Sequence, residues 1–320
     1  DNSSPPDISF FKIITNLANN ILSNEDENIR PKDDNGKTGG LINLSSFDEV
    51  IIIPDLHARR NFLKDLLFWK NKEKSVFELL ESNEAALLCL GDGVHSEGTF
   101  ASRWTKAFEE YAKDFREKTY MDMEIADSFN LMIAIMCLKI RYSNNFHFLK
   151  GNHENITNET GNGNFSFAKY ANEGAMVLEY FEKFYDMEML DIYSQFEKNL
   201  PLFVVGKNFL ASHAEPQYFF EREKIINYRN DGDLIEALTW TENFSSQRGT
   251  VDKYLSYYLN NNDTEHTYYF GGHRPITGKF NKINKDRYIQ IHNPAKEIVA
   301  VINQNNQINL NDDIKILKYL

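Results

Sequence analysis

Five short apolar segments in this chain each run into a polar turn that carries an aspartate, asparagine or histidine. They read EVIIIPDLHA from residue 49, AALLCLGDGVH from 85, NNFHFLKGNHE from 144, KNFLASHAEP from 207 and HTYYFGGHRP from 266. Short apolar runs bounded by turn residues are typical of buried strands. The stretches between them, 60–80, 100–118, 122–142, 167–198 and 232–259, have helical patterns. Strands that alternate with helices predict an α/β layer fold, which places ligands outside the carboxyl ends of its strands.

Further helices and strands are predicted at both ends of the chain. Apolar residues at helical spacing predict an amphipathic helix over 8–22 that packs against the domain. Residues 23–40 lack periodicity and are interpreted as a linker or mobile loop. RYIQIHNP and EIVAVINQNNQINL, between 287 and 310, predict two further strands in an edge or second-sheet hairpin. We therefore divide the chain into an N-terminal helix and linker, 1–45, and a main domain, 46–320.

Composition excludes several classes of protein. The net charge is −12, from 47 acidic against 35 basic residues, which disfavours bulk nucleic acid as a partner because a duplex-binding protein needs a basic footprint. The longest apolar runs, such as 131–138, are far too short to span a bilayer. Cys89 and Cys137 lie in apolar runs, so both are expected in the core rather than in a disulfide or a thiolate zinc site. They favour a cytoplasmic chain, while the start at Asp1 without a methionine leaves a processed or secreted form open.

The residue types at the strand ends are those that bind metal ions. Hard or borderline cations accept carboxylate oxygen and imidazole nitrogen, and asparagine adds a neutral oxygen. Asp55 and His57 are two residues apart, so both can point at one ion. Asp92 has a second carboxylate oxygen with which to bridge two ions. The remaining strand-end residues would complete a second site: Asn152, His213 and His273.

The same residues carry a family resemblance. PDLHA, GDGVHSEG, GNHE, SHAEP and GGHRP resemble the five signature blocks of the calcineurin-like metallophosphoesterases. They are most similar to the phosphoprotein phosphatase branch, and the GGHRP end with YIQIHNP after it looks closest to bacterial and phage-type members. The resemblance covers about 48–303. It implies an αββα sandwich of two mixed sheets flanked by helices, with a dinuclear metal site at the strand ends.

The resemblance also implies roles for individual residues. Two divalent ions (manganese, iron or zinc) would be held, the first by Asp55, His57 and Asp92, and the second by Asp92, Asn152, His213 and His273. The family uses a metal-bridging hydroxide to attack phosphorus. His153 would donate a proton to the leaving oxygen, and Arg248, in SSQRGT, matches an arginine that clamps phosphate.

The second block departs from the family pattern. The family continues this block with Asp-Arg-Gly, whereas this chain has His95 and Ser96, followed by Glu97. We hypothesise that His95 hydrogen-bonds His153, with Glu97 behind it, which would make activity sensitive between pH 5 and 8. The candidates to replace the missing arginine are Arg59, Arg60 and Arg103, and the sequence does not choose among them.

Two further features depart from the usual pattern or stay open. A helical insertion at about 98–125 is expected to form a lid or wall near the metal site. Trp104 lies within it at core-like spacing. For His292, a second-shell or substrate role stays open beside a merely structural one.

The leading function is a metal-dependent phosphomonoesterase or protein phosphatase, with a phosphoprotein or small phosphoester as substrate. One alternative is a hydrolase of nucleotide or dinucleoside polyphosphates. A second alternative is a metal-binding scaffold of low activity, since the second-block arginine is missing. Oligomeric state is left open by the sequence.

Overall fold

The apolar runs form two mixed sheets. The fold is given by a computed structural model that describes residues 4–259, 266–285 and 287–319. Within those residues the first sheet has the order β13-β12-β2-β5-β6, in which β2, β5 and β6 are parallel and β12 is antiparallel to both β2 and β13. Its strands are β2 (Glu49–Ile53), β5 (Ala85–Cys89), β6 (Phe146–Phe148), β12 (Lys296–Asn303) and β13 (Ile314–Tyr319).

The second sheet, likewise counted over the described residues, has the order β1-β7-β8-β9-β11-β10. The neighbours β8, β9 and β11 are parallel to one another, and β7 and β10 pair antiparallel at either side. Its strands are β1 (Leu41–Asn43), β7 (Phe203–Val205), β8 (Phe209–Ser212), β9 (Tyr268–Gly271), β10 (Asn281–Ile283) and β11 (Tyr288–Gln290).

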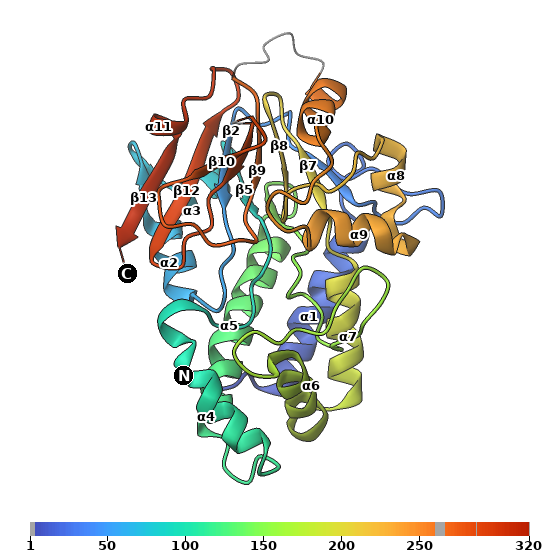
Figure 1. The fold of residues 1–320 in the computed structure, drawn as a ribbon, viewed down its shortest axis with the longest axis vertical. Helices are drawn as coiled ribbons and strands as arrows, with labels where there is room; N and C mark the ends of the chain where they lie inside the picture. The colour runs from blue at the N-terminus through green and yellow to red at the C-terminus, as the bar shows by residue number, and fades with distance from the viewer. Residues whose placement is uncertain (1–3, 260–265, 286, 320) are drawn as a thin grey trace.

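Alternation along the strands builds three apolar layers. Val50 and Ile52 face Val204 and Phe270 in the layer between the sheets, because successive side chains of a strand point to opposite faces. The opposite face of the first sheet packs against one set of helices: α1 (Ile8–Ser23), α2 (Arg60–Phe68), α3 (Val76–Glu81), α4 (Ser102–Tyr111), α5 (Thr119–Arg141), α6 (Glu173–Phe184) and α7 (Met187–Lys198). The second sheet packs against α8 (Arg222–Ile226), α9 (Gly232–Thr239) and α10 (Thr250–Leu259). This is the αββα sandwich that the resemblance implied (Figure 1).

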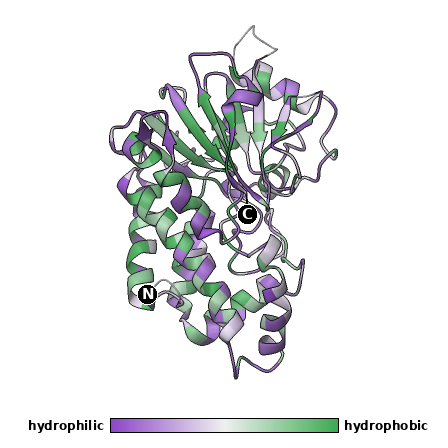
Figure 2. Ribbon diagram, turned by 90° about the vertical axis from the view of Figure 1, so that its left-hand side faces the viewer, coloured by the Kyte–Doolittle hydropathy of each residue, from purple (hydrophilic) through white to green (hydrophobic). Residues whose placement is uncertain are grey.

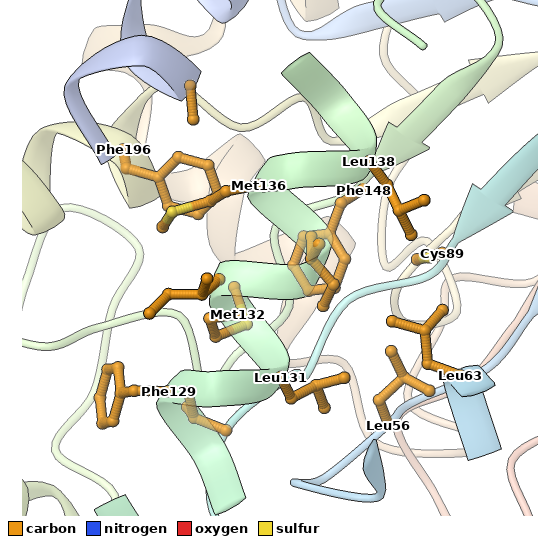
Figure 3. Packing of buried hydrophobic residues seen from close by; sticks show 14 of the residues in the cluster. Leu56, Leu63, Cys89, Phe129, Leu131, Met132, Met136, Leu138, Phe148 and Phe196 are labelled. Carbon is orange, nitrogen blue, oxygen red and sulfur yellow. The ribbon is translucent and has the colours of Figure 1, made fainter. Parts of the chain in front are cut away.

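Helix α5 is the central element of the helical layer. Figure 3 shows Leu131 of α5 on the side that faces Leu56 and Leu63, with Met132 in the same buried cluster. Apolar residues likewise concentrate on the strands and on the inward sides of the helices in Figure 2. Cys89 is buried as expected, but Cys137 is exposed, so its prediction as a core residue was wrong. The apolar run around Cys137 is helical, and position 137 falls on the outer face of α5.

Two predicted helices are interrupted. Residues 69–75 separate α2 from α3 and form a small hairpin of β3 (Lys70–Asn71) and β4 (Lys74–Ser75). Ser75 then caps α3 through its side chain, with Glu78 completing a capping box, which ends any continuous helix over 60–80. The segment 232–259 divides into α9 and α10 around the polar turn TENFSSQRG.

The N-terminal segment is anchored along its length. The predicted helix is α1, which buries Phe11 among the aromatic rings of α5, α6 and α7. Residues 24–40 are irregular, but they are not the loose loop that we expected. Arg30 is buried and donates to Glu25, Gly39 O and Asn199 O. The division of the chain after residue 45 stays a prediction.

The C-terminal strands do not form the hairpin that we predicted. β11 belongs to one sheet and β12 to the other, and β11 instead pairs antiparallel with β10. Across the described ranges, none of the helices combines the length and the apolar character needed to cross a membrane.

Candidate metal centre

The six predicted ligands lie at the carboxyl ends of five strands. Because β2, β5 and β6 are parallel neighbours, and so are β8 and β9, the loops that follow them meet at one edge of each sheet. The structure brings all six side chains together there, and each of them is buried: Asp55, His57, Asp92, Asn152, His213 and His273.

One group of ligand atoms converges on the amide oxygen of Asn152. Nε2 of His213 and Nδ1 of His273 each lie 2.9 Å from Asn152 Oδ1. Nε2 of His213 is also 3.3 Å from Oδ2 of Asp92. Since a carboxylate and an amide oxygen only accept hydrogen bonds, these oxygens suit either protons on the imidazole nitrogens or a metal cation among them.

A second group shares the same carboxylate oxygen. His57 Nε2 lies 3.8 Å from Asp55 Oδ2 and 3.8 Å from Asp92 Oδ2. Asp92 Oδ2 therefore belongs to both groups, as a bridge between two ions would require. Oδ2 of Asp55 is buried and has no hydrogen-bond partner in the described part of the chain, which leaves it available to a ligand.

Backbone contacts aim these side chains. Nδ1 of His57 lies 3.0 Å from His95 O, and Nδ1 of His213 lies 2.9 Å from Leu90 O. A ring nitrogen that faces a carbonyl must carry the proton, so the Nε2 lone pair of each ring points into the site. Glu154 holds the loops themselves, because its carboxylate accepts from the backbone N–H groups of Asp92, Gly93 and Gly151.

The turns that carry the ligands are tight. His57, Asp92 and His273 adopt left-handed backbone conformations, with φ values of 44°, 51° and 61°, which are uncommon for residues other than glycine and cluster at functional sites. A Cβ on Gly272 would lie 1.8 Å from Asp55 Oδ1. Only glycine therefore allows the backbone before His273 to approach Asp55 this closely.

Electrostatics at the site favour cations. Burial alone would lower the pKa of His213, but the charges of Asp92 and Asp55 raise it to about 9. Burial would raise the pKa of Asp92, and the surrounding imidazoles hold it well below its ordinary value instead. The carboxylates of Asp92 and Asp55 therefore stabilise a positive charge on His213, and they would stabilise the charge of a metal ion in the same way. The oxygen and nitrogen donor set fits divalent metal ions.

His153 lies beside the bridging carboxylate. Its Nε2 is 3.7 Å from Asp92 Oδ2, and its backbone N–H donates to Asp92 Oδ1. Its Nδ1 is 2.9 Å from Nδ1 of His95, so the hydrogen bond that we hypothesised is present. The ring of Phe167 stacks on His95 and contacts His153. Burial is the main cause that lowers the pKa of His153 well below its ordinary value and that of His95 to about 3.

Glu97 does not lie behind His95. Its Oε2 is 3.3 Å from Nε2 of His292, and its Oε1 is 3.6 Å from Nε2 of His57. Glu97 also accepts from Lys169 at 2.5 Å. The turn after Ser96 carries the carboxylate towards the first group of ligands, and away from the side of His95 that contacts His153.

The arginines considered as replacements are held by other partners. Arg103 is buried and donates to Ser96, Glu124 and Asp127. Arg60 pairs with Asp127. Arg59 donates to backbone oxygens, among them Asp55 O at 2.6 Å, and so positions the first ligand loop.

The predicted insertion contacts the second block through Arg103 and Trp104, both of which donate to Ser96, and its role as a lid or wall stays a prediction. Trp104 of α4 is fully buried, as its core-like spacing indicated, and its indole N–H donates to Ser96 O. Arg248 is exposed on the loop before α10. The structure does not bring it into contact with the six side chains, and its assignment stays a prediction.

Four residues near the centre were missed or left open by sequence reasoning. Glu154 could have been found, because it belongs to the GNHE block. His292 is buried among the ligands, where the sequence had left its role open. Arg274 and Lys169 bring positive charge towards Glu97. Burial lowers the pKa of both groups and the charge of Glu97 raises it; the pKa of Lys169 is raised overall, whereas that of Arg274 is lowered. Arg274 could have been found in the same way as Glu154, because it belongs to the GGHRP block, whereas no sequence signal distinguishes Lys169 from other surface residues.

Comparison with known proteins agrees with this geometry. The model of the calcineurin-like phosphoesterase family matches residues 49–277. No curated protein sequence matches the chain. Its fold is similar to that of a protein serine/threonine phosphatase from Saccharomyces cerevisiae (16% identity, TM-score 0.55, 98% of this chain and 91% of that chain). It is also similar to a mutant cold-active protein tyrosine phosphatase (14% identity, TM-score 0.50, 87% and 82%).

Proposed function

Because this chain belongs to the calcineurin-like phosphoesterase family, we propose that it is a metal-dependent phosphomonoesterase of the phosphoprotein phosphatase branch, acting on phosphorylated side chains of proteins. The observation that carries the proposal is the convergence of six buried ligand side chains beside His153. A scaffold that bound no substrate would have no need for a complete ligand set together with a histidine beside the shared carboxylate.

The six side chains would hold two divalent ions of manganese, iron or zinc. When bound, such ions supply a nucleophile at neutral pH and stabilise the charge that develops on the phosphoryl oxygens. Asp92, shared by both ligand groups, fixes the distance between the two sites. The backbone hydrogen bonds of His57, His213 and Glu154 keep the ligands preorganised.

His153 would hold a proton at Nε2 and pass it to the leaving oxygen. That nitrogen faces the bridging carboxylate, while Nδ1 is held by His95. A positioned general acid contributes roughly 10²–10⁴-fold to a rate. In this role His95 fixes the orientation of the ring, which the family achieves with an aspartate.

Positive charge for the phosphate would come from residues outside the second block. Arg274 follows His273 and pairs with Glu242; burial lowers its pKa, although the charges of Glu97 and Asp92 act to raise it. The ammonium group of Lys169 donates to Glu97, which lies beside the first group of ligands. Arg248 would add a contact from the loop before α10. Guanidinium groups suit phosphate oxygens because they donate two parallel hydrogen bonds.

A groove beside the centre supports a substrate larger than a phosphoryl group. Its volume is about 670 Å³, and it runs along α2 to Glu97. Phe68 and Phe100 line it and are 69% and 52% exposed. Such a surface suits the residues that flank a phosphorylated side chain. The two solved structures compared above are protein phosphatases.

A substrate panel tests the proposal. Wild type and His153→Asn are assayed with p-nitrophenyl phosphate, a phosphopeptide and a dinucleoside polyphosphate, each with manganese, iron and zinc. We expect the phosphopeptide to be hydrolysed best, and the variant to lose roughly 10²–10⁴-fold in kcat with unchanged metal content. Preference for the dinucleoside polyphosphate would indicate the alternative hydrolase. Absence of hydrolysis with every metal would indicate the scaffold.

A further inference from the structure

His292 lies among the first group of ligands although it comes from a late strand. It follows β11, which is parallel to β9, so it reaches the same sheet edge as His273. Its side chain is 1% exposed, and Nδ1 lies 3.9 Å from Asp55 Oδ2. Neither atom has a hydrogen-bond partner among the described residues. Two buried polar atoms that face each other unpaired are costly unless a further group binds between them.

The geometry of His57 supports the same centre. The imidazole rings of His57 and His292 are 5.3 Å apart. One ligand atom from each, with one from Asp55, lie within 4.8 Å of one another. That arrangement matches what one ion needs, because ligand atoms at about 2.0–2.2 Å from a metal lie about 3–4 Å apart.

We propose that His292 is an additional ligand of the ion at Asp55 and His57, binding through Nδ1, and that Glu97 positions it. The inference rests on the metal centre of the proposed function. The second group already offers a carboxylate, an amide and two imidazoles. With His292, the first group offers two carboxylates and two imidazoles, so that both ions have four protein ligands.

Glu97 supplies the outer contact that such a histidine needs. Its Oε2 lies 3.3 Å from Nε2 of His292, so the ring carries its proton on Nε2 and turns the Nδ1 lone pair towards Asp55. Metal-bound histidines commonly donate the other ring N–H to a carboxylate, which fixes the ring and raises its basicity. Lys169 holds Glu97 from the other side. Glu97, which belongs to the divergent part of the second block, thus has a proposed role in positioning His292.

The proposal has a consequence for metal choice. Two imidazoles at each site favour zinc, iron, cobalt or manganese over magnesium and calcium, which prefer all-oxygen sites. Magnesium should therefore bind wild type weakly at both sites.

Manganese binding tests the proposal without reference to activity. Wild type, His292→Ala, Glu97→Gln and His147→Asn are titrated with Mn²⁺ by calorimetry and followed by electron paramagnetic resonance. His147→Asn is the matched control, because His147 is a buried histidine that contacts Lys139 and Asn144 far from the ligands. Wild type should bind two ions with a spin-coupled signal, and the control should do the same.

His292→Ala should keep one ion and weaken the other by about 10–100-fold or more, so that an uncoupled Mn²⁺ signal replaces the coupled one. Glu97→Gln should weaken the same site by less, and His292→Asp should restore part of the affinity because a carboxylate also binds Mn²⁺. If the alanine variant does not fold, His292→Phe, which keeps a ring but has no ligand atom, takes its place.

Two unchanged binding steps in a folded His292 variant would overturn the ligand assignment. Loss of an ion in Glu97→Gln that is as complete as in His292→Ala would overturn the positioning role and make Glu97 a ligand. A wild type that binds two ions but hydrolyses no phosphoester would overturn the proposed function and leave this inference standing.

Discussion

The Nδ1 atoms of His95 and His153 lie 2.9 Å apart, so one imidazole donates its N–H to the other. Two neutral imidazoles therefore meet where the family pairs a histidine with a carboxylate. The contact fixes the ring of His153 with its Nε2 towards Asp92. Because His95 is buried, with a pKa lowered to about 3, it orients its neighbour without adding charge.

His95→Asn tests this orienting contact. We expect kcat to fall by about tenfold or more, since the contribution of a general acid depends on its geometry, with metal content and Tm close to wild type. His95→Asp should retain activity, because a carboxylate stabilises a His153 ring that carries protons on both nitrogens. Equal kcat in wild type and His95→Asn would show that the contact has no catalytic consequence.

Glu154→Ala tests the support beneath the ligands. Its carboxylate accepts three backbone N–H groups, from Asp92, Gly93 and Gly151, at 2.7–2.9 Å. Leaving these buried donors unpaired should lower the free energy of unfolding by about 3 kcal/mol or more and weaken metal binding by about 10–100-fold. Urea denaturation and metal titration measure the two effects. The exposed Glu182→Ala is the control, and an equally small loss in both variants would contradict the account.

The positive charges near the centre can be ranked by mutation. Arg274→Ala should lower kcat/KM by about 10²-fold, because Arg274 follows the predicted ligand His273 and its guanidinium feels the charges of Glu97 and Asp92. Arg248→Ala should lower it by about tenfold, since Arg248 is exposed in the structure. Arg116→Ala, an exposed arginine of the insertion, is the control. An unchanged kcat/KM in Arg248→Ala would remove that residue from the site.

A buried ion cluster ties the N-terminal segment to α5. Glu25 accepts from Arg30 at 2.6 Å and from Lys139. Burial would raise the pKa of Glu25, but the charges of Lys139 and Arg30 hold it well below its ordinary value. A carboxylate with a lowered folded pKa stabilises the protein fully above its unfolded pKa, near 4.5, and loses that contribution as the pH falls towards the folded value.

Glu25→Gln should therefore show a shallower loss of stability in acid. Wild type should lose up to about 1.4 kcal/mol per pH unit more than the variant below about pH 4.5, and the variant should be less stable at pH 7. Urea unfolding at pH 7, 5 and 4 measures both quantities. Parallel pH profiles for wild type and Glu25→Gln would contradict the pairing, with Glu182→Gln as the control.

The local pattern was enough to predict an α/β layer fold and the strand-end residues, while the two-sheet sandwich was implied by the family resemblance. An apolar run followed by Asp55, Asn152 or His213 is a pattern of a few neighbouring residues, and parallel pairing then brings such ends together. Interruptions were harder to predict. The capping box at Ser75 is local, yet its effect depends on the pairing of β3 with β4.

Residues whose place depends on long-range pairing could not be predicted. His292 reaches the ligands only because β11 pairs with β9, whereas the sequence suggested a hairpin with the following strand. Glu97 contacts His57 and His292 because the loop after β5 meets the residues that follow β2 and β11, a long-range contact that its own sequence neighbours do not reveal. Arg30, in a segment without periodicity, is buried because Glu25 and Asn199 O lie within its reach.

Crystals grown with manganese test the central claim most directly. Anomalous diffraction should show two peaks about 3.5–4 Å apart, bridged by Asp92, with one ion at Asp55 and His57 and the other at Asn152, His213 and His273. A single peak remote from Asp92, or no peak in crystals that hold millimolar manganese, would contradict the account.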